Sequence, residues 1–134
     1  MQSPLITVVV LTSLSIWYIG QTRPSLSAAA MQKDAVQITH GPVVENVTDT
    51  TAIIAWSTNV NSGTVLRYGS DPQYLDKTAS MPWGGLTHRV NLKDLKPDTT
   101  YYFQAESREG QGTGTTAQAA LASFQTNPAS QPSK

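Results

Sequence analysis

Short segments in which apolar and polar residues alternate fill the chain after residue 31. In residues 50–57, the side chains of Ala52, Ile54 and Trp56 share one face, and the intervening residues share the other. The same period of two recurs in three further segments, residues 64–68, 87–93 and 100–108. One apolar and one polar face at this period is typical of antiparallel strands with a solvated side. No long stretch after residue 31 keeps a helical period, so the sequence predicts an all-β domain.

Residues that favour turns separate these segments. Glycine, proline, asparagine, serine and aspartate gather in four places, residues 59–63, 69–72, 82–85 and 109–114. We expect turns or loops there. An earlier strand, residues 36–47, is expected to break at Gly41-Pro42 as edge strands do, and a last strand to cover residues 115–126. Seven short antiparallel strands joined by turns predict a β-sandwich.

An uncharged apolar segment, residues 4–19, precedes the strands and is predicted to form a hydrophobic helix. Cleavage of a signal peptide after Ala30 is favoured by the small residues Ala28-Ala29-Ala30, although residues 1–3 lack the usual positive side chain. Retention as a membrane anchor also explains the apolar run, although sixteen residues are short for a span of ~20. Both interpretations place the rest of the chain outside the cytoplasm. A membrane is contacted only through residues 4–19, and only if they are not cleaved.

These features divide the chain into four parts. Residues 1–30 are the signal peptide or membrane anchor, residues 31–36 a linker, residues 37–126 the β-domain and residues 127–134 a tail. The tail contains no large apolar residue, so it cannot bury enough surface to fold. We therefore expect it to be disordered.

The residues just before the segment 100–108 resemble a family signature. Leu95-Lys96-Pro97-Asp98-Thr99-Thr100-Tyr101 is similar to the L-x-P-x-T-x-Y sequence of fibronectin type III domains. The resemblance implies an immunoglobulin-like sandwich with a tyrosine corner, in which the Tyr101 ring packs in the core and its hydroxyl bonds to the backbone just upstream. Pro97 then presets the turn, and Leu95 closes the end of the sandwich. Trp56 and Tyr68 are expected to complete this structural set.

A narrower resemblance covers nearly all of residues 37–126. Four segments carry it in order: residues 65–69 (VLRYG), 88–95 (HRVNLKDL), 101–103 (YYF) and 124–126 (FQT). Together they resemble the N-terminal domain of purple acid phosphatases, a fibronectin-like accessory domain that precedes a metallophosphatase domain. The metal ligands of that family belong to the catalytic domain, and no GD, GNH or GHxH motif occurs in this chain. The resemblance therefore implies the fold without phosphatase activity.

The composition argues against several classes of function. Nine basic residues balance nine acidic ones, so no net charge attracts nucleic acid. Cysteine is absent, which excludes disulfides, thiolate metal sites and a cysteine nucleophile. The two histidines, His40 and His88, are accompanied by no carboxylate pair or Ser-His-Asp set. We therefore expect no catalytic residue, cofactor or metal site, and a chain that is not an enzyme.

Two aromatic residues remain as candidates for binding. Trp83 lies in one predicted loop and Tyr74 in another. An exposed indole in a loop can stack on a sugar or anchor a protein partner, and the alternative is that Trp83 folds back over an open sheet edge. His88 shares a face with Val90 and Leu92, so a partly buried, hydrogen-bonded structural role is favoured over a ligand role.

The sequence as a whole favours an exported, non-catalytic fibronectin type III binding or spacer module at the cell envelope, with an unidentified protein or carbohydrate as partner. Two alternatives stay open. One is an accessory domain that serves a metallophosphatase or a carbohydrate-active enzyme in trans. The other is a carbohydrate-binding module that uses Trp83 and Tyr74.

Overall fold

Two long antiparallel strands form the centre of the fold. The computed structural model describes residues 35–110 and 114–132, and the predicted helix at residues 4–19 lies outside this range. Strand β2 (Ala52–Gly69) pairs along most of its length with strand β3 (Lys77–Leu92). Within the described part of the chain, no helix is long and apolar enough to cross a membrane.

Four shorter strands complete the domain: β1 (Ile38–Val47), β4 (Thr100–Arg108), β5 (Thr116–Gln118) and β6 (Ala122–Gln125). β1 pairs with the first half of β2, and β4 pairs with the second half. β5 and β6 both pair with β4. All of these pairs are antiparallel, and β1 and β5 lie at the two ends of the strand order β1-β2-β4-β5.

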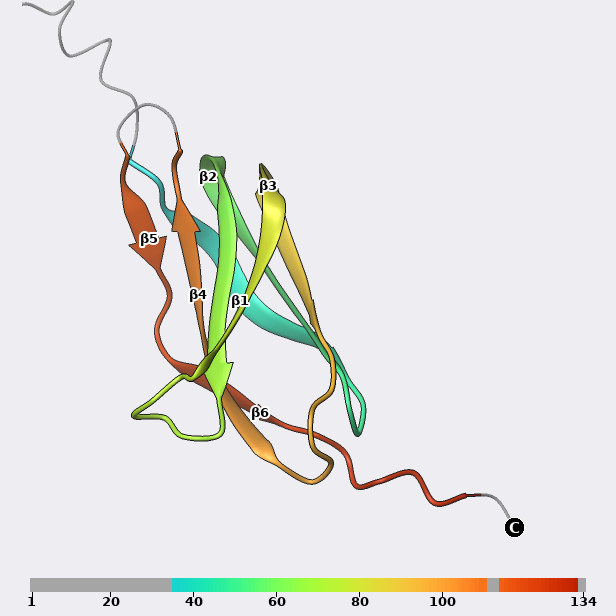
Figure 1. Cartoon of the computed structure of the whole chain (residues 1–134). Helices are drawn as coiled ribbons and strands as arrows, with labels where there is room; N and C mark the ends of the chain where they lie inside the picture. The colour runs from blue at the N-terminus through green and yellow to red at the C-terminus, as the bar shows by residue number, and fades with distance from the viewer. Residues whose placement is uncertain (1–34, 111–113, 133–134) are drawn as a thin grey trace, which may run out of the picture. The chain divides into compact units, whose positions relative to one another are not determined.

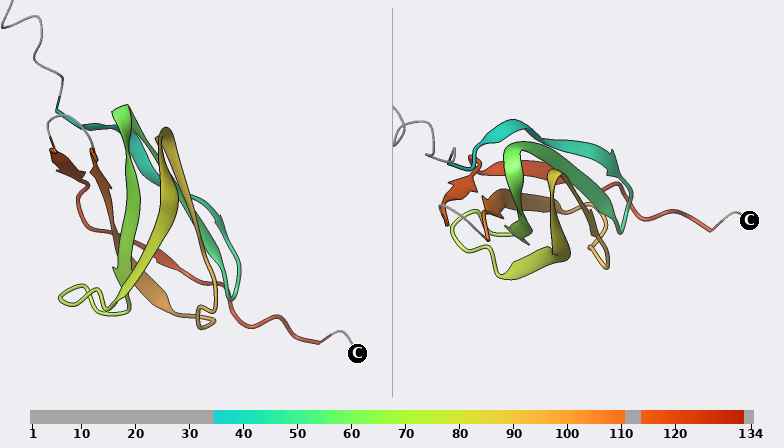
Figure 2. Two further views of the ribbon diagram at one scale, coloured as in Figure 1. Left: turned by 45° about the horizontal axis from the view of Figure 1, so that its top comes forward. Right: turned by 90° about the horizontal axis from the view of Figure 1, so that it is seen from above.

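β2 and β3 each contribute to both layers of the sandwich. Each strand runs along one layer, bends over at one end of the domain and returns along the other layer (Figure 1). At the bend, residues 58–61 of β2 lie opposite a single residue of β3, and residues 82–84 of β3 lie opposite a single residue of β2. Extra residues of this kind bend a strand and increase its twist. Figure 2 shows the two layers that result.

The sequence predicted loops at residues 59–63 and 82–85, and the structure corrects this prediction. Both segments continue their strands as bulges. Asparagine, glycine and proline mark loops and bulges alike, because both need backbone that leaves the regular ladder. The described residues form six strands, two of them long, where the sequence predicted seven short ones.

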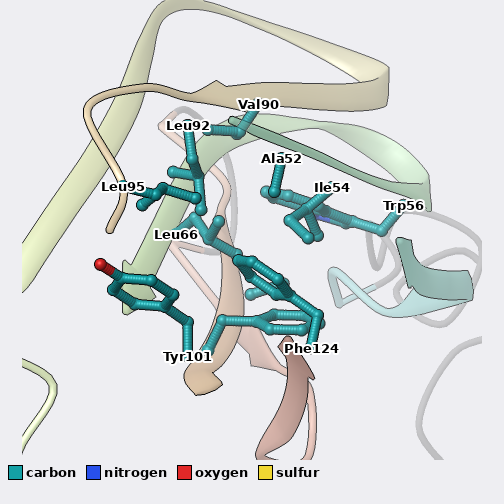
Figure 3. Close-up of a cluster of buried hydrophobic side chains, with 11 residues drawn as sticks. Ala52, Ile54, Trp56, Leu66, Val90, Leu92, Leu95, Tyr101 and Phe124 are labelled. Carbon is teal, nitrogen blue, oxygen red and sulfur yellow. The ribbon is translucent and has the colours of Figure 1, made fainter. Parts of the chain in front are cut away.

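The core lies between the two layers (Figure 3). Ala52, Ile54 and Trp56 of β2 are at most 2% exposed, so the apolar face predicted for this segment is the buried face. The other buried members of the core are Leu66, Val90, Leu92, Leu95, Tyr101, Phe103, Ala105 and Phe124. Burying a large apolar side chain stabilises a fold by ~1.5–3 kcal/mol, so this cluster is the main source of stability.

The segment before β4 has the geometry of a tyrosine corner. The Tyr101 hydroxyl accepts a hydrogen bond from the Lys96 N–H at 3.0 Å. Leu95 is 5% exposed and belongs to the core, and Pro97 is partly buried in the turn. Tyr68 packs against the core from β2, with its ring centroid 6.5 Å from that of Tyr101. The turn into β4 is thus held by one hydrogen bond to the Tyr101 side chain and by the burial of Leu95 before the turn and Tyr101 after it.

The first and last strands differ in detail from their predictions. The predicted strand at residues 115–126 is divided into β5 and β6, which pair with different parts of β4. β1 is one strand with a register shift at Gly41-Pro42, where the sequence predicted a break. Gly41 has a φ of 79°, and a Cβ there would lie 2.8 Å from the Ala55 carbonyl oxygen. Only glycine fits this conformation and this close approach.

Part of the predicted tail is attached to the domain. The Asn127 N–H donates to the Thr48 carbonyl at 3.0 Å, and the Asp98 N–H donates to the Asn127 carbonyl at 3.0 Å. The Ser130 N–H and hydroxyl both donate to Asp49 Oδ2, at 3.1 and 2.8 Å, and these bonds lower the pKa of that carboxyl. Residues up to Ser130 are therefore held against the turn between β1 and β2, and the expectation of disorder does not apply to them.

Substitutions in the core test the strand assignment. Tyr101→Phe deletes the corner hydrogen bond and is expected to destabilise the domain by ~0.5–1.5 kcal/mol, the usual net value of one such bond. Trp56→Ala leaves a large cavity and is expected to cost ~3–5 kcal/mol. Urea unfolding followed by circular dichroism measures both. Tyr102→Phe, on the other face of β4, is the matched control and should cost less than ~0.5 kcal/mol. Equal, negligible effects at Tyr101 and Trp56 would contradict the assignment.

Candidate functional site

Trp83 lies in the bulge of β3, and its side chain is 68% exposed. The backbone beside it lies close to β2, because a Cβ at Gly84 would lie 2.9 Å from both the Asn61 side-chain oxygen and the Ser62 carbonyl oxygen. Only glycine permits this approach of β3 to β2. The indole therefore lies at the bent end of the domain and is largely open to solvent.

Tyr74 lies in the loop between β2 and β3 and is 71% exposed. Its N–H donates to the Asp71 carbonyl at 3.1 Å, and the Gln73 N–H donates to Asp71 Oδ1 at 2.9 Å. Pro72 restricts the backbone of the same turn. The loop folds closely onto the end of β2, since a Cβ at Gly69 would lie 3.1 Å from the Tyr74 carbonyl oxygen. Tyr74 is therefore exposed from a well-supported turn.

The structure does not bring Trp83 and Tyr74 together. Tyr74 precedes Lys77, the first residue of β3. The extended strand from Lys77 to Trp83 spans roughly 20 Å at ~3.3 Å per residue. Figure 1 shows the β2–β3 loop at one end of the domain and the bend of β2 and β3 at the other. The two side chains cannot contact the same sugar ring, so a single stacking site built from both is ruled out.

His88 lies in the core and is 1% exposed, so it is more deeply buried than the sequence indicated. Its ring stacks on Trp56 with 5.2 Å between centroids. Nδ1 is 2.6 Å from Thr64 Oγ1, and Nε2 is 2.9 Å from Thr58 Oγ1. Both nitrogens are occupied by hydroxyl groups, so neither is open to a metal ion or a substrate.

The hydrogen bonds around His88 assign its tautomer. The Thr58 hydroxyl donates to the Val60 carbonyl at 2.9 Å, so its oxygen is left to accept from Nε2–H. Nδ1 is then the unprotonated nitrogen, and it accepts from the Thr64 hydroxyl. A second proton on the ring would turn Nδ1 into a donor and leave the Thr64 proton without its acceptor. Burial lowers the pKa of His88 below 6.5, in agreement with a neutral ring at pH 7.

A cluster of buried hydroxyl groups surrounds this histidine, and the sequence did not predict it. Thr58 and Ser62 are joined by a 3.1 Å hydrogen bond between their hydroxyls, and Trp56 Nε1–H donates to Ser107 Oγ at 2.8 Å. These residues and Thr64 are at most 5% exposed. The only signal in the sequence is a run of serine and threonine around residues 57–64, and such residues in a predicted loop are usually solvated.

Several of the charged side chains form ion pairs on the surface. Arg89 Nε lies 2.8 Å from Glu45 Oε2, and an Arg67 nitrogen lies 3.7 Å from Glu106 Oε2. Exposed ion pairs of this kind contribute ~0–1 kcal/mol to the free energy of unfolding, so they stabilise the fold little. In residues 35–110 and 114–132, no three His, Asp or Glu side chains lie close enough together to hold a metal ion.

The family follows from comparison of the sequence with known families. Residues 41–126 match the family described as Purple acid Phosphatase, N-terminal domain. The chain belongs to this family. The match runs from the glycine of β1 to the threonine that follows β6, so it covers the sandwich and more than half of the chain. The family resemblance seen in the sequence is therefore confirmed.

Solved structures show the same fold. The third fibronectin III domain of human KIAA0343 protein has a TM-score of 0.54 at 19% identity, covering 86% of this chain and 97% of that one. The fn3 domain of human contactin 1 gives 0.52 at 17% identity over 69% and 78% of the two chains. The sixth fibronectin type III domain of human fibronectin type III domain containing protein 3 gives 0.51 at 24% identity over 76% and 94%. At these identities the likeness establishes a fibronectin type III-like fold and nothing further. None of the curated proteins compared with the chain matches it in sequence.

The buried histidine makes stability depend on pH in a defined window. The unfolded chain protonates His88 near its ordinary pKa of 6.5, whereas the folded chain does so only at lower pH. The stability that neutral His88 contributes is therefore complete above about pH 6.5 and falls as the pH drops towards the folded pKa, by at most ~1.4 kcal/mol per pH unit. Urea unfolding from about pH 7.5 to about pH 5.5 measures this slope.

Two histidine variants separate this effect from other titrating groups. His88→Gln is expected to be less stable at neutral pH and to lose most of the slope, whereas His40→Gln, at an exposed position on β1, is expected to keep it. Nuclear magnetic resonance titration of the imidazoles in the unaltered chain gives an independent reading if His88→Gln does not fold. A slope unchanged in a folded His88→Gln variant, or a His88 ring that titrates at or above pH 6.5 in the folded chain, would contradict the assignment.

Proposed function

We propose that this chain is an exported, non-catalytic binding and spacer module of the cell envelope. The observation that carries the proposal is the display of Trp83 and Tyr74, 68% and 71% exposed, from backbone that packs closely on β2 at Gly84 and Gly69. Aromatic side chains on rigid backbone are favourable contact points, because they bury a large area and lose little conformational entropy on binding. His88, by contrast, presents no reactive group to solvent.

The places where the chain enters and leaves the domain support a spacer role. The Ala35 carbonyl accepts a hydrogen bond from the Asn59 side chain, so the chain enters at the bent end of β2. Asn127 is hydrogen-bonded to Thr48 in the turn between β1 and β2, so the chain leaves at the other end (Figure 1). Because the polypeptide enters the domain at one end and leaves it at the other, the domain separates the segments on its two sides by its own length.

Export is proposed from the apolar residues 4–19 and from the cleavage site that Ala28-Ala29-Ala30 provides. We expect the mature chain to begin at Met31, and mass spectrometry of the protein purified from its native host measures this. An intact chain in the membrane fraction, resistant to salt and carbonate washing, would favour the membrane anchor instead. Full-length chain in the soluble cytoplasm would contradict both versions and the envelope role with them.

The absence of catalysis is part of the proposal. The purified full-length chain is expected to hydrolyse no phosphomonoester, because the described residues hold no cluster of metal ligands and their buried histidine is enclosed. We also expect it to retain no stoichiometric iron, zinc or manganese after dialysis. A chromogenic phosphate ester and elemental analysis measure the two quantities. One equivalent of retained metal per chain, or hydrolysis that copurifies with the chain, would contradict the proposal.

A second candidate function is that of an accessory domain acting in trans on a metallophosphatase or a carbohydrate-active enzyme. The family match favours it, because this family is named for a domain of purple acid phosphatases. A neighbouring gene for such an enzyme would support this role. A pull-down from the native envelope fraction, with the full-length chain as bait and a Trp83→Ser chain as the matched control, tests both candidates. Capture of the enzyme supports the accessory role, and capture of a different envelope component supports the binding module.

A further inference from the structure

A pocket of about 470 Å³ opens beside Tyr74 on the outer face of β2 and β4. This volume falls within the ~300–1,000 Å³ typical of small-molecule sites. Its walls come from three separate parts of the domain, namely the β2–β3 loop, the paired strands β2 and β4, and the link between β5 and β6. The lining residues that matter here are Arg67, Gln73, Tyr74, Gln104 and Leu121.

Two large apolar side chains line this pocket and are open to water. Tyr74 is 71% exposed, and Leu121, in the link between β5 and β6, is 45% exposed. Two hydrogen bonds to Asp71 hold the turn that carries Tyr74, so the backbone of this turn is in place before a ligand arrives. An aromatic ring and an aliphatic side chain at one pocket favour a ligand with an apolar face.

The floor of the pocket is polar and is built by a cross-strand pair. Arg67 of β2 lies directly opposite Gln104 of β4. The Gln104 amide donates to the Ala119 carbonyl at 2.9 Å and accepts from Gln118 Nε2 at 3.0 Å. A glutamine amide has two N–H donors and two lone pairs, so one of each is left for a ligand. The Arg67 guanidinium adds a planar set of N–H donors at the same place.

These features disfavour two ligand classes. An extended peptide binds a sheet through unpaired backbone groups, but Arg67 is paired with Thr78 of β3 on one side and with Gln104 of β4 on the other. A strongly charged ligand needs an uncompensated charge, but the Arg67 guanidinium lies 3.7 Å from the Glu106 carboxylate. The apolar side chains of Tyr74 and Leu121 beside the polar groups of Arg67 and Gln104 favour an uncharged molecule with an apolar ring face and several hydroxyl groups.

We infer that this pocket binds a neutral sugar residue of a polysaccharide, an inference that rests on the binding role proposed above. One face of the pyranose ring packs on Tyr74 and Leu121. The ring hydroxyls accept hydrogen bonds from Arg67 and share the free donor and acceptor of the Gln104 amide. Trp83 lies at the other end of the domain and takes no part in this site.

Affinity electrophoresis of the full-length chain tests the inference. The chain is kept in a nonionic detergent without a sugar headgroup, and the gels contain xylan, galactomannan, mixed-linkage β-glucan or dextran. At least one of these neutral polysaccharides is expected to retard the chain. Tyr74→Ser is expected to weaken the retention roughly tenfold or more, and Arg67→Gln to weaken it severalfold. Circular dichroism verifies that the variants are folded, as their exposed positions lead us to expect.

Two matched variants complete the test. Tyr74→Phe keeps the ring face and is expected to retain binding, and Trp83→Ser removes an equally exposed aromatic residue at the far end and is expected to leave binding unchanged. No retention by any of the four polysaccharides would overturn the inference, as would retention that depends on Trp83 and not on Tyr74. Capture of a protein from the envelope that is lost in Tyr74→Ser would overturn it too, because the pocket would then serve a protein partner. A different result contradicts the proposed function, namely the recovery of full-length chain from the soluble cytoplasm.

Discussion

The bend of β2 is the constraint on which the rest of the sandwich depends. Because β2 and β3 cross from one layer to the other without a break, the two layers are joined by continuous strands as well as by side-chain packing. The bulges that allow the crossing place polar groups inside the protein, where an unsatisfied group costs ~1–3 kcal/mol. Thr58 and Thr64 meet this requirement through His88, which links the two halves of the bend and stacks on Trp56 in the core. A polar cluster therefore holds the corner, and apolar side chains hold the layers.

How far the sequence predicted the fold depends on how local each feature is. The buried face of residues 50–57 follows from a period of two, which is visible within a few residues. The tyrosine corner joins Lys96 and Tyr101 within one short motif, so the motif was enough to predict it. The bulges of β2 and β3 were predicted as loops, because their composition is the same and only the partner strand distinguishes them. The predicted number of strands differs from the observed number partly for that reason, and partly because β1 is continuous and the last predicted strand is divided into β5 and β6.

The candidate sites show the same dependence on distance along the chain. Tyr74 and Trp83 were both predicted as candidate binding residues, and both are exposed. The sequence could not show that the first part of β3, from Lys77 to Trp83, separates them. The pocket beside Tyr74 is also lined by Arg67, Gln104 and Leu121. These residues come from other elements and belong to no sequence motif, so the sequence could not predict the pocket. The hydroxyl partners of His88 were missed because Thr64 meets that ring only across the β2–β3 pair.

The edges of this sheet also govern how copies of the domain behave towards one another. The register of β1 shifts three times along its pairing with β2, and Pro42 offers no N–H. At the far side, β5 and β6 are only three and four residues long. Along β1, β5 and β6 the described sheet therefore presents no long, regular row of N–H and C=O groups on which a strand of a second molecule could extend it. Among the described strands β3 pairs only with β2, so β3 has a free side as well, and the bulge at residues 82–84 divides that side into two shorter segments. Edge-to-edge joining of copies is therefore disfavoured at β1 and at β5 and β6, and β3 is the strand at which it would have to begin.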